Sequence, residues 1–139
     1  MKEQQVRIVR EVPDAENYAA LRKQAGLSPR SEQGIKIGMG NSLFAVSLYA
    51  GGELIGMGRV IGDGGCFLQI VDIAVRPDYQ GQGLGKVIMN ELMDYLKRET
   101  PADAYVSLIA DQPADKLYLK YGFRYTAPDS LGMYLRIAK

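Results

Sequence analysis

The 139-residue chain contains no histidine, no tryptophan and a single cysteine. Without histidine, Ser-His-Asp and Cys-His catalysis are excluded, and the commonest metal ligand is missing. The single cysteine excludes an internal disulfide, and without a histidine to form its thiolate Cys66 is expected to be a buried, inert thiol. Acid-base chemistry must therefore come from carboxylate, tyrosine or lysine side chains, from the terminal amine, or from water.

The chain also lacks a strong excess of one charge and a long apolar run. Seventeen basic residues stand against sixteen acidic ones, which argues against a nucleic-acid partner that needs a basic face. No apolar stretch reaches the roughly 18 to 20 residues of a membrane span, and the N-terminal MKEQQVRIVRE is not a signal peptide. We therefore expect one domain over residues 1–139 in a cytoplasmic protein, with no membrane partner.

The most informative stretch runs from residue 69 to residue 98 and predicts a strand, a glycine-rich turn and a helix. A β-branched run ends before Pro77, whose missing N–H closes a strand. Apolar residues then recur every four positions from Leu84 to Leu96 and form one stripe of a helix. Between them, alternating glycines permit close approach to the backbone, and the free amides of a helix N-terminus attract an anion, usually a phosphate.

The spacing of these glycines narrows the choice of phosphate ligand. Gln80 and Val87 occupy deciding positions of a Walker loop, and Lys86 stands where a dinucleotide fingerprint needs its last glycine, so both motifs fail. What remains is Gln80-x-x-Gly83-x-Gly85. A flexible helix entry without a ligand is the alternative, but each glycine costs roughly 0.5 to 1 kcal/mol against alanine. We therefore favour a ligand.

The remaining pattern alternates between short strands and helices. The expected strands cover residues 5–11, 42–50, 53–61, 66–75, 104–109, 123–125 and 133–137. Helices are expected after Pro13, Gly83 and Pro113. Residues 27–40 are either a short helix capped by Ser31 or a surface connection, which the residues alone slightly favour. Strand 104–109 follows a crossover and is expected to run parallel to strand 66–75.

The segment DIAVRPDYQGQGLGKVIM resembles the acyl-coenzyme A-binding signature of the GNAT superfamily of N-acetyltransferases, Gln/Arg-x-x-Gly-x-Gly/Ala, and is similar to the central segment of the glucosamine-6-phosphate N-acetyltransferases. The resemblance spans nearly the whole chain. It implies a mixed α/β (α+β) fold, with a mostly antiparallel six- to seven-stranded sheet, about four flanking helices and a splayed central pair of parallel strands. It also implies acetyl-coenzyme A as co-substrate, no metal, and a small-molecule amine as acceptor, and it leaves a homodimer open.

By the same resemblance, backbone amides of the glycine loop hold the pyrophosphate of coenzyme A. Main-chain groups of Ile73 and Val75 are expected to bind the pantetheine arm and the acetyl carbonyl. The expected cofactor-binding residues are Ile73, Ala74, Val75, Gln80, Gly81, Gln82, Gly83, Leu84, Gly85, Lys86, Asp111 and Tyr118.

Tyr118 is the expected proton donor to the departing thiolate. Residues 114–123 resemble the family's Ala-x-x-hydrophobic-Tyr-x-x-x-Gly-Phe, whose tyrosine often lies beside the cofactor sulfur, and a phenol of pKa near 10 can protonate a thiolate. Taken alone, such a tyrosine is usually packing, and Tyr121 is a less favoured candidate. Asp111 stands where many relatives have asparagine, and it either caps the helix before Pro113 or meets the ammonium of the substrate.

Asp72 is the best carboxylate for a general base, because it lies on the central strand. An aspartate in an apolar strand must be paired or near water, so a purely structural role is the favoured alternative. Glu32 is a distant second candidate, and a water chain would also serve. Arg22, Lys23 and Arg30 could meet an anionic substrate, although solvated surface is the favoured interpretation.

Two other functions stay open from the sequence. The acceptor amine could belong to a protein, in which case the substrate groove should be an open channel rather than a closed pocket. The chain could also be a coenzyme A-binding sensor that does not catalyse, and this protein would be indifferent to the loss of the Tyr118 hydroxyl.

Overall fold

The computed structural model describes residues 5–139 and contains one five-stranded sheet with the order β1-β2-β3-β4-β5. The first four strands pair as an antiparallel meander, and β5 joins parallel to β4. The strands are β1 (Val6–Val9), β2 (Phe44–Ala50), β3 (Glu53–Gly62), β4 (Phe67–Val75) and β5 (Tyr105–Ser107). The helices are α1 (Ala15–Gln24), α2 (Glu32–Gly40), α3 (Leu84–Glu99) and α4 (Asp115–Leu119), with a 3-10 turn, η1, at Pro77–Tyr79.

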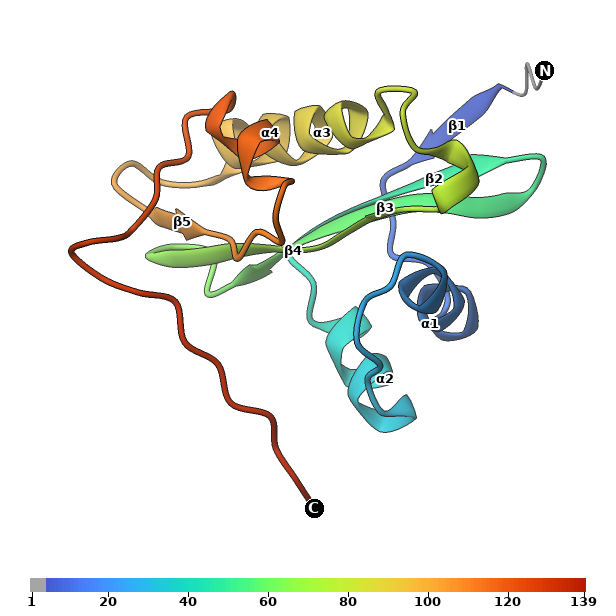
Figure 1. The fold of residues 1–139 in the computed structure, drawn as a ribbon, viewed down its shortest axis with the longest axis horizontal. Helices are drawn as coiled ribbons and strands as arrows, with labels where there is room; N and C mark the ends of the chain where they lie inside the picture. Colours follow the sequence, from blue (N-terminus) through green and yellow to red (C-terminus); the bar gives the residue numbers. More distant parts are fainter. Residues whose placement is uncertain (1–4) are drawn as a thin grey trace. The chain divides into compact units, whose positions relative to one another are not determined.

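The chain divides into two compact units, the first ending at Ser107 and the second covering Leu108–Lys139. In the first unit α3 covers one face of the sheet, and α1 and α2 lie on the other (Figure 1). The apolar stripe predicted for α3 is buried against the sheet. A Cβ atom at Gly58 of β3 would lie 2.6 Å from Ile88 Cγ2, so the glycine lets the helix approach closely.

The second face carries its own core beneath α1 and α2. Tyr18, Leu21 and Ile35 from these helices pack with apolar residues of β3 and β4. Ser31 caps α2, because its Oγ accepts a hydrogen bond of 2.9 Å from the backbone N–H of Gly34. The interpretation of residues 27–40 as a plain surface connection is therefore wrong, and burial of Ile35 explains why the short helix forms despite its glycines.

The parallel pair of strands is much shorter than its neighbours. Only Phe67–Gln69 of β4 pairs with β5, whereas the pairing of β4 with β3 extends to Val75. Beyond Gln69, this edge of β4 pairs with no strand of residues 5–139. The parallel direction expected from the crossover is confirmed, and the early end of β5 leaves main-chain groups of β4 without a neighbouring strand.

The second unit contains α4 but no strand among residues 108–139. The predicted hairpin of residues 123–125 and 133–137 is therefore wrong, and the sheet has five strands rather than six or seven. The apolar alternation is present, but Leu131, Met133, Leu135 and Ile137 are 75 to 89% exposed. Alternation reports which side chains share a face, and an isolated pair of strands with no apolar surface to cover is marginal in water.

The turn before β4 also corrects an expectation. Asp63 Oδ1 accepts hydrogen bonds from the backbone N–H groups of Gly65, Cys66 and Phe67 at 2.8 to 3.1 Å, and these bonds hold the pKa of Asp63 below its usual value. Cys66 lies in this turn and is exposed, rather than buried as expected. Cys66 lies before the first paired residue of β4, so the alternation of buried and exposed side chains along the strand does not apply to it.

Candidate active site

The glycine loop connects β4 through η1 to the N-terminus of α3. Gly81 and Gly83 both have φ of +81°, which L side chains rarely adopt. Gly83 is the N-cap of α3 and has no side chain to cap the helix. The amides of the first turn of α3 therefore face outward without an intrahelical acceptor, at the positive end of the helix dipole.

The space over the loop can accommodate a ligand. A Cβ atom built at Gly81 or Gly83 meets no atom within 4 Å, so the glycines serve the backbone conformation and leave the loop surface open. Gln80 Nε2 donates a hydrogen bond of 2.9 Å to the carbonyl of Val75, which ties the loop back to the end of β4. Loop amides, the unpaired edge of β4 and the start of α3 thus lie together, as a diphosphate with an extended arm would require.

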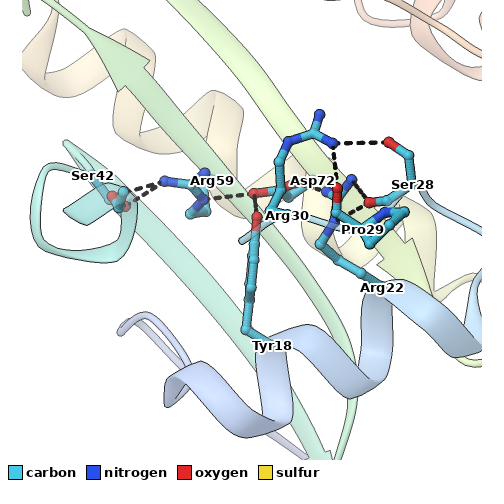
Figure 2. A network of polar contacts seen from close by, with 9 residues as sticks. Tyr18, Arg22, Ser28, Pro29, Arg30, Ser42, Arg59 and Asp72 are labelled. Carbon is cyan, nitrogen blue, oxygen red and sulfur yellow. Dashed lines mark hydrogen bonds and ion pairs between the residues drawn. The ribbon is translucent and has the colours of Figure 1, made fainter. Parts of the chain in front are cut away.

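Asp72 lies on β4 with φ of +63°, an uncommon conformation for a residue with a side chain. The register of β3 and β4 shifts between Met57 and Arg59, opposite this position. The side chain of Asp72 is only 5% exposed and points toward α1 (Figure 2). A buried carboxylate in this place must be paired.

Three side chains supply the partners of Asp72. Tyr18 Oη donates to Asp72 Oδ2 at 2.6 Å, and Arg59 Nε donates to the same oxygen at 2.7 Å. Arg22 Nη1 donates to Asp72 Oδ1. Figure 2 shows this arrangement, with Tyr18 reaching the carboxylate from α1. Burial, and then the hydrogen bond to Asp72, raises the pKa of Tyr18.

The two arginines are anchored beyond Asp72 as well. Arg22 Nε and Nη2 donate to the carbonyl of Ser28 at 3.0 and 2.6 Å. Arg59 Nη1 donates to Ser42 Oγ at 2.8 Å and to the carbonyl of Gly38 at 3.2 Å. The network therefore links α1, the loop after it, the end of α2 and two strands through hydrogen bonds to one buried carboxylate and its partners.

Sequence reasoning missed part of this network. The sequence patterns do not single out Tyr18 or Arg59, and they favour solvated surface for Arg22, which is in fact only 6% exposed. Arg59 carried a usable signal, because a charge within the apolar run ELIGMGRVI must find a partner, and Asp72 stands in the next strand. Arg22 carried a weaker one, since nothing local distinguishes an inward arginine of α1 from an outward one.

A pocket of about 300 Å³ lies beside the network. Apolar side chains of α2, β3 and β4 form part of its wall, including Ile35, Ile61 and Val71. Its polar groups come from Tyr18, Arg30, Ser31, Arg59 and Asp72. Its volume suits a small ligand, and along β4 it ends at Asp72, directly before the residues expected to bind the acyl donor.

The second unit holds the other predicted residues. Tyr118 lies in α4 and is 9% exposed, and its ring meets that of Phe123 edge to face with centroids 6.5 Å apart. Burial, and then the negative charge of Asp111, raises the pKa of Tyr118. Asp111 is exposed, and its carbonyl accepts a hydrogen bond from the N–H of Ala114 at 2.8 Å. The structure thus brings Asp111 and Tyr118 near each other, and separately brings the loop and β4 together.

Residues 5–139 contain neither a membrane-spanning helix nor a cluster of metal ligands. In this range no helix combines the length and the apolar character needed to cross a membrane. Within the same residues, no three histidine, cysteine or acidic side chains cluster as a metal site would require.

Comparison with known proteins places this geometry in a family. Residues 12–123 match the acetyltransferase (GNAT) family. The crystal structure of SA2161 from meticillin-resistant Staphylococcus aureus, a probable acetyltransferase of unknown function, is 53% identical with a TM-score of 0.92, and the match covers 96% of this chain and 100% of that one.

More distant relatives agree with this assignment. Glucosamine-6-phosphate N-acetyltransferase from Arabidopsis thaliana has the same fold, with a TM-score of 0.70 at 17% identity over 97% of this chain and 100% of that one. The uncharacterized N-acetyltransferase ycf52 of Pyropia yezoensis is 33% identical over 93 residues, which are 64% of this chain and 52% of that protein. This chain thus spans about half the length of that relative. The family match, the fold and the glycine loop agree, and the chain belongs to the acetyltransferase (GNAT) family.

Proposed function

We propose that this protein is an acetyl-coenzyme A-dependent N-acetyltransferase, which transfers the acetyl group to the primary amine of a small molecule by direct attack of the amine on the thioester. The observation that carries the proposal is the junction of β4 and α3. There the edge of β4, which pairs with no strand of residues 5–139 beyond Gln69, leads into a loop of left-handed glycines and the N-terminus of a 16-residue helix.

The donor-binding residues are proposed as follows. Acetyl-coenzyme A supplies an acetyl group activated as a thioester. The amides of Gly81 to Lys86 bind its diphosphate, and Gln80 fixes the loop from which they point. Main-chain groups of Ile73–Val75 bind the pantetheine arm as an added strand would be bound, because β5 has ended before this point.

Tyr118 is proposed as the proton donor to the thiolate of coenzyme A. Its place in the family motif supports this role, and so does its raised pKa, because the phenol keeps its proton at every pH where the enzyme would work. The neighbouring Asp111 contributes to that shift. Asp111 is proposed to contact the donor or the ammonium of the acceptor, the two roles that its position in the motif allows.

Asp72 is proposed to organise the acceptor site. Its two oxygens already accept three hydrogen bonds from Tyr18, Arg22 and Arg59. These bonds occupy three of the roughly four lone-pair positions of the carboxylate and stabilise its charged form, which makes it a weak base for proton abstraction from an amine. The acceptor therefore arrives uncharged or gives its proton to water, and Asp72 holds the side chains around it in place.

A small acceptor is favoured over a protein by the shape of the site. The pocket beside Asp72 has a volume of about 300 Å³, which is in the range of small-ligand pockets.

The cytoplasmic location expected from the sequence stays a prediction. A homodimer is also proposed, because the apolar side chains of residues 131–137 include five that are 75 to 89% exposed and would be covered by a second copy.

The test of this function is an acetyl-coenzyme A assay over a panel of amines and peptides that follows thiol release. Tyr118→Phe should lower kcat by about 100-fold, since general acid catalysis contributes at least that much, with an unchanged Kd for coenzyme A. Tyr105→Phe is the matched control, because Tyr105 is 52% exposed on β5 and lies outside the proposed sites. Bound coenzyme A with no thiol release for any amine or peptide would instead indicate a sensor.

A further inference from the structure

The pocket beside Asp72 carries more positive than negative charge. Arg22 and Arg59 share the single carboxylate of Asp72, so this buried cluster keeps one uncompensated positive charge. Arg30 adds a second guanidinium to the pocket wall. Arginine stays charged under all ordinary conditions, so the imbalance cannot be relieved by losing a proton.

Arg59 has hydrogen-bond donors left for a ligand. Its side chain is 10% exposed, and it uses Nε for Asp72 and Nη1 for Ser42 and Gly38. Nη2 donates to no residue within 5–139. No buried side-chain polar atom of these residues lacks a partner, so Nη2 is not buried, and Arg59 is one of the residues that line the pocket. Arg22, in contrast, uses all three of its nitrogens within the network.

Arg30 contributes from the rim of the pocket. Among the described residues, its guanidinium donates only to neutral oxygens, the hydroxyl of Ser28 at 2.9 Å and the carbonyl of Pro29 at 3.0 Å. The side chain of the nearby Glu32 is 88% exposed, and its Oε1 lies 4.0 Å from Nζ of Lys36. This ion pair involves Lys36 rather than Arg30. The charge of Arg30 is therefore available to an anion in the pocket.

We propose that Arg59 and Arg30 bind an anionic group of the acceptor, so the substrate class is a small primary amine that also carries a carboxylate or a phosphate ester. The inference rests on the acetyltransferase function proposed above. Both anions accept charge-assisted N–H bonds, so Nη2 of Arg59 can donate to one of their oxygens while Arg30 supplies a second guanidinium. The pocket adjoins β4 immediately before Ile73, so an anion held there leaves the amine of a small acceptor near the proposed thioester site.

The test compares three amines of similar size: ethanolamine, O-phosphoethanolamine and β-alanine. The wild-type protein should show kcat/KM at least about tenfold higher for one or both anionic amines than for ethanolamine, through a lower KM. The two anionic arms distinguish phosphate from carboxylate. The preference should weaken as the salt concentration rises, because Arg30 is exposed.

Three variants assign the preference to the pocket. Arg30→Gln should reduce the ratio of kcat/KM for the anionic amine to that for ethanolamine by about five- to tenfold, and Arg30→Lys should restore part of it. Arg98→Gln removes the same charge from an exposed site on α3 and should leave the ratio unchanged. The inference is wrong if ethanolamine is used as efficiently as its anionic counterparts, or if Arg30→Gln lowers the affinity for coenzyme A rather than this ratio.

A direct binding measurement separates this inference from the acetyltransferase proposal. Isothermal titration of O-phosphoethanolamine, β-alanine and ethanolamine into the protein with coenzyme A present requires no turnover. Tighter binding of an anionic amine, lost in Arg30→Gln, supports the anion site even if no amine is acetylated, an outcome that would overturn the proposed function alone. Equal binding of all three compounds overturns the anion site.

Discussion

Replacing Asp72 by asparagine tests whether this carboxylate holds the structure together or takes a proton. Asparagine has nearly the same volume and adopts the left-handed conformation as readily as aspartate, so the φ of +63° at this position is preserved. The substitution therefore isolates the negative charge. Arg22 and Arg59 lose their counter-ion. In addition, the side-chain NH2 group of asparagine is a hydrogen-bond donor and would face the N–H donors that now bind the carboxylate.

The size of the effect follows from burial. The side chains of Asp72, Arg22 and Arg59 are 5%, 8% and 10% exposed, so solvent screens them little. Removing one partner of a buried ion pair costs about 3 to 5 kcal/mol. For a domain of this size, each kcal/mol lowers Tm by roughly 3 to 4 °C, so Asp72→Asn should lower Tm by about 9 to 20 °C.

Urea unfolding at 15 °C and thermal unfolding measure the loss directly. Asp94→Asn is the matched control, because Asp94 is exposed on α3, and its free energy of unfolding should stay within about 0.5 kcal/mol of wild type. A different result would refute the reasoning. If Asp72→Asn retains wild-type stability but loses kcat, and activity returns as the pH rises, then Asp72 is a general base rather than a positioning residue.

Three further outcomes are expected. Gly83→Ala places a Cβ at φ of +81°, which costs about 1 to 2 kcal/mol and should weaken coenzyme A binding in isothermal titration. Gly40→Ala, where the added Cβ meets no atom within 4 Å and φ is not positive, should bind normally. The raised pKa of Tyr18 means that the unfolded chain loses this proton first as the pH rises through about 10, so the contribution of Tyr18 to the free energy of unfolding should be complete below that pH and be lost above it. Urea unfolding at pH 8.5 and 10.5 should show a smaller fall in Tyr18→Phe, and an equal fall would contradict this assignment. Leu135→Lys should convert a homodimer to a monomer in sedimentation velocity, and a wild-type protein that is monomeric at all concentrations would exclude the dimer.

Most of the helices and strands of this fold can be predicted from local sequence patterns. The apolar stripe of α3, the two-glycine turn between β2 and β3 and the cap of α2 each depend on residues within one or two turns of one another. The prediction of a C-terminal hairpin was wrong because strand formation depends on more than a local pattern. Its alternation is local, but a strand also needs a partner and a surface to cover, and residues 108–139 provide no strand.

The sequence by itself determined the donor side of the proposed site, because left-handed glycines, a helix start and a strand end occupy one continuous stretch from Val75 to Leu84. Only the tertiary structure decided the acceptor side. Arg59 reaches Asp72 from the paired strand β3, only 13 residues away. Tyr18 and Arg22 stand 54 and 50 residues from Asp72, and they meet it only when α1 packs across β3 and β4. Whether an arginine is solvated or holds a buried carboxylate depends on that packing, and no local pattern records it.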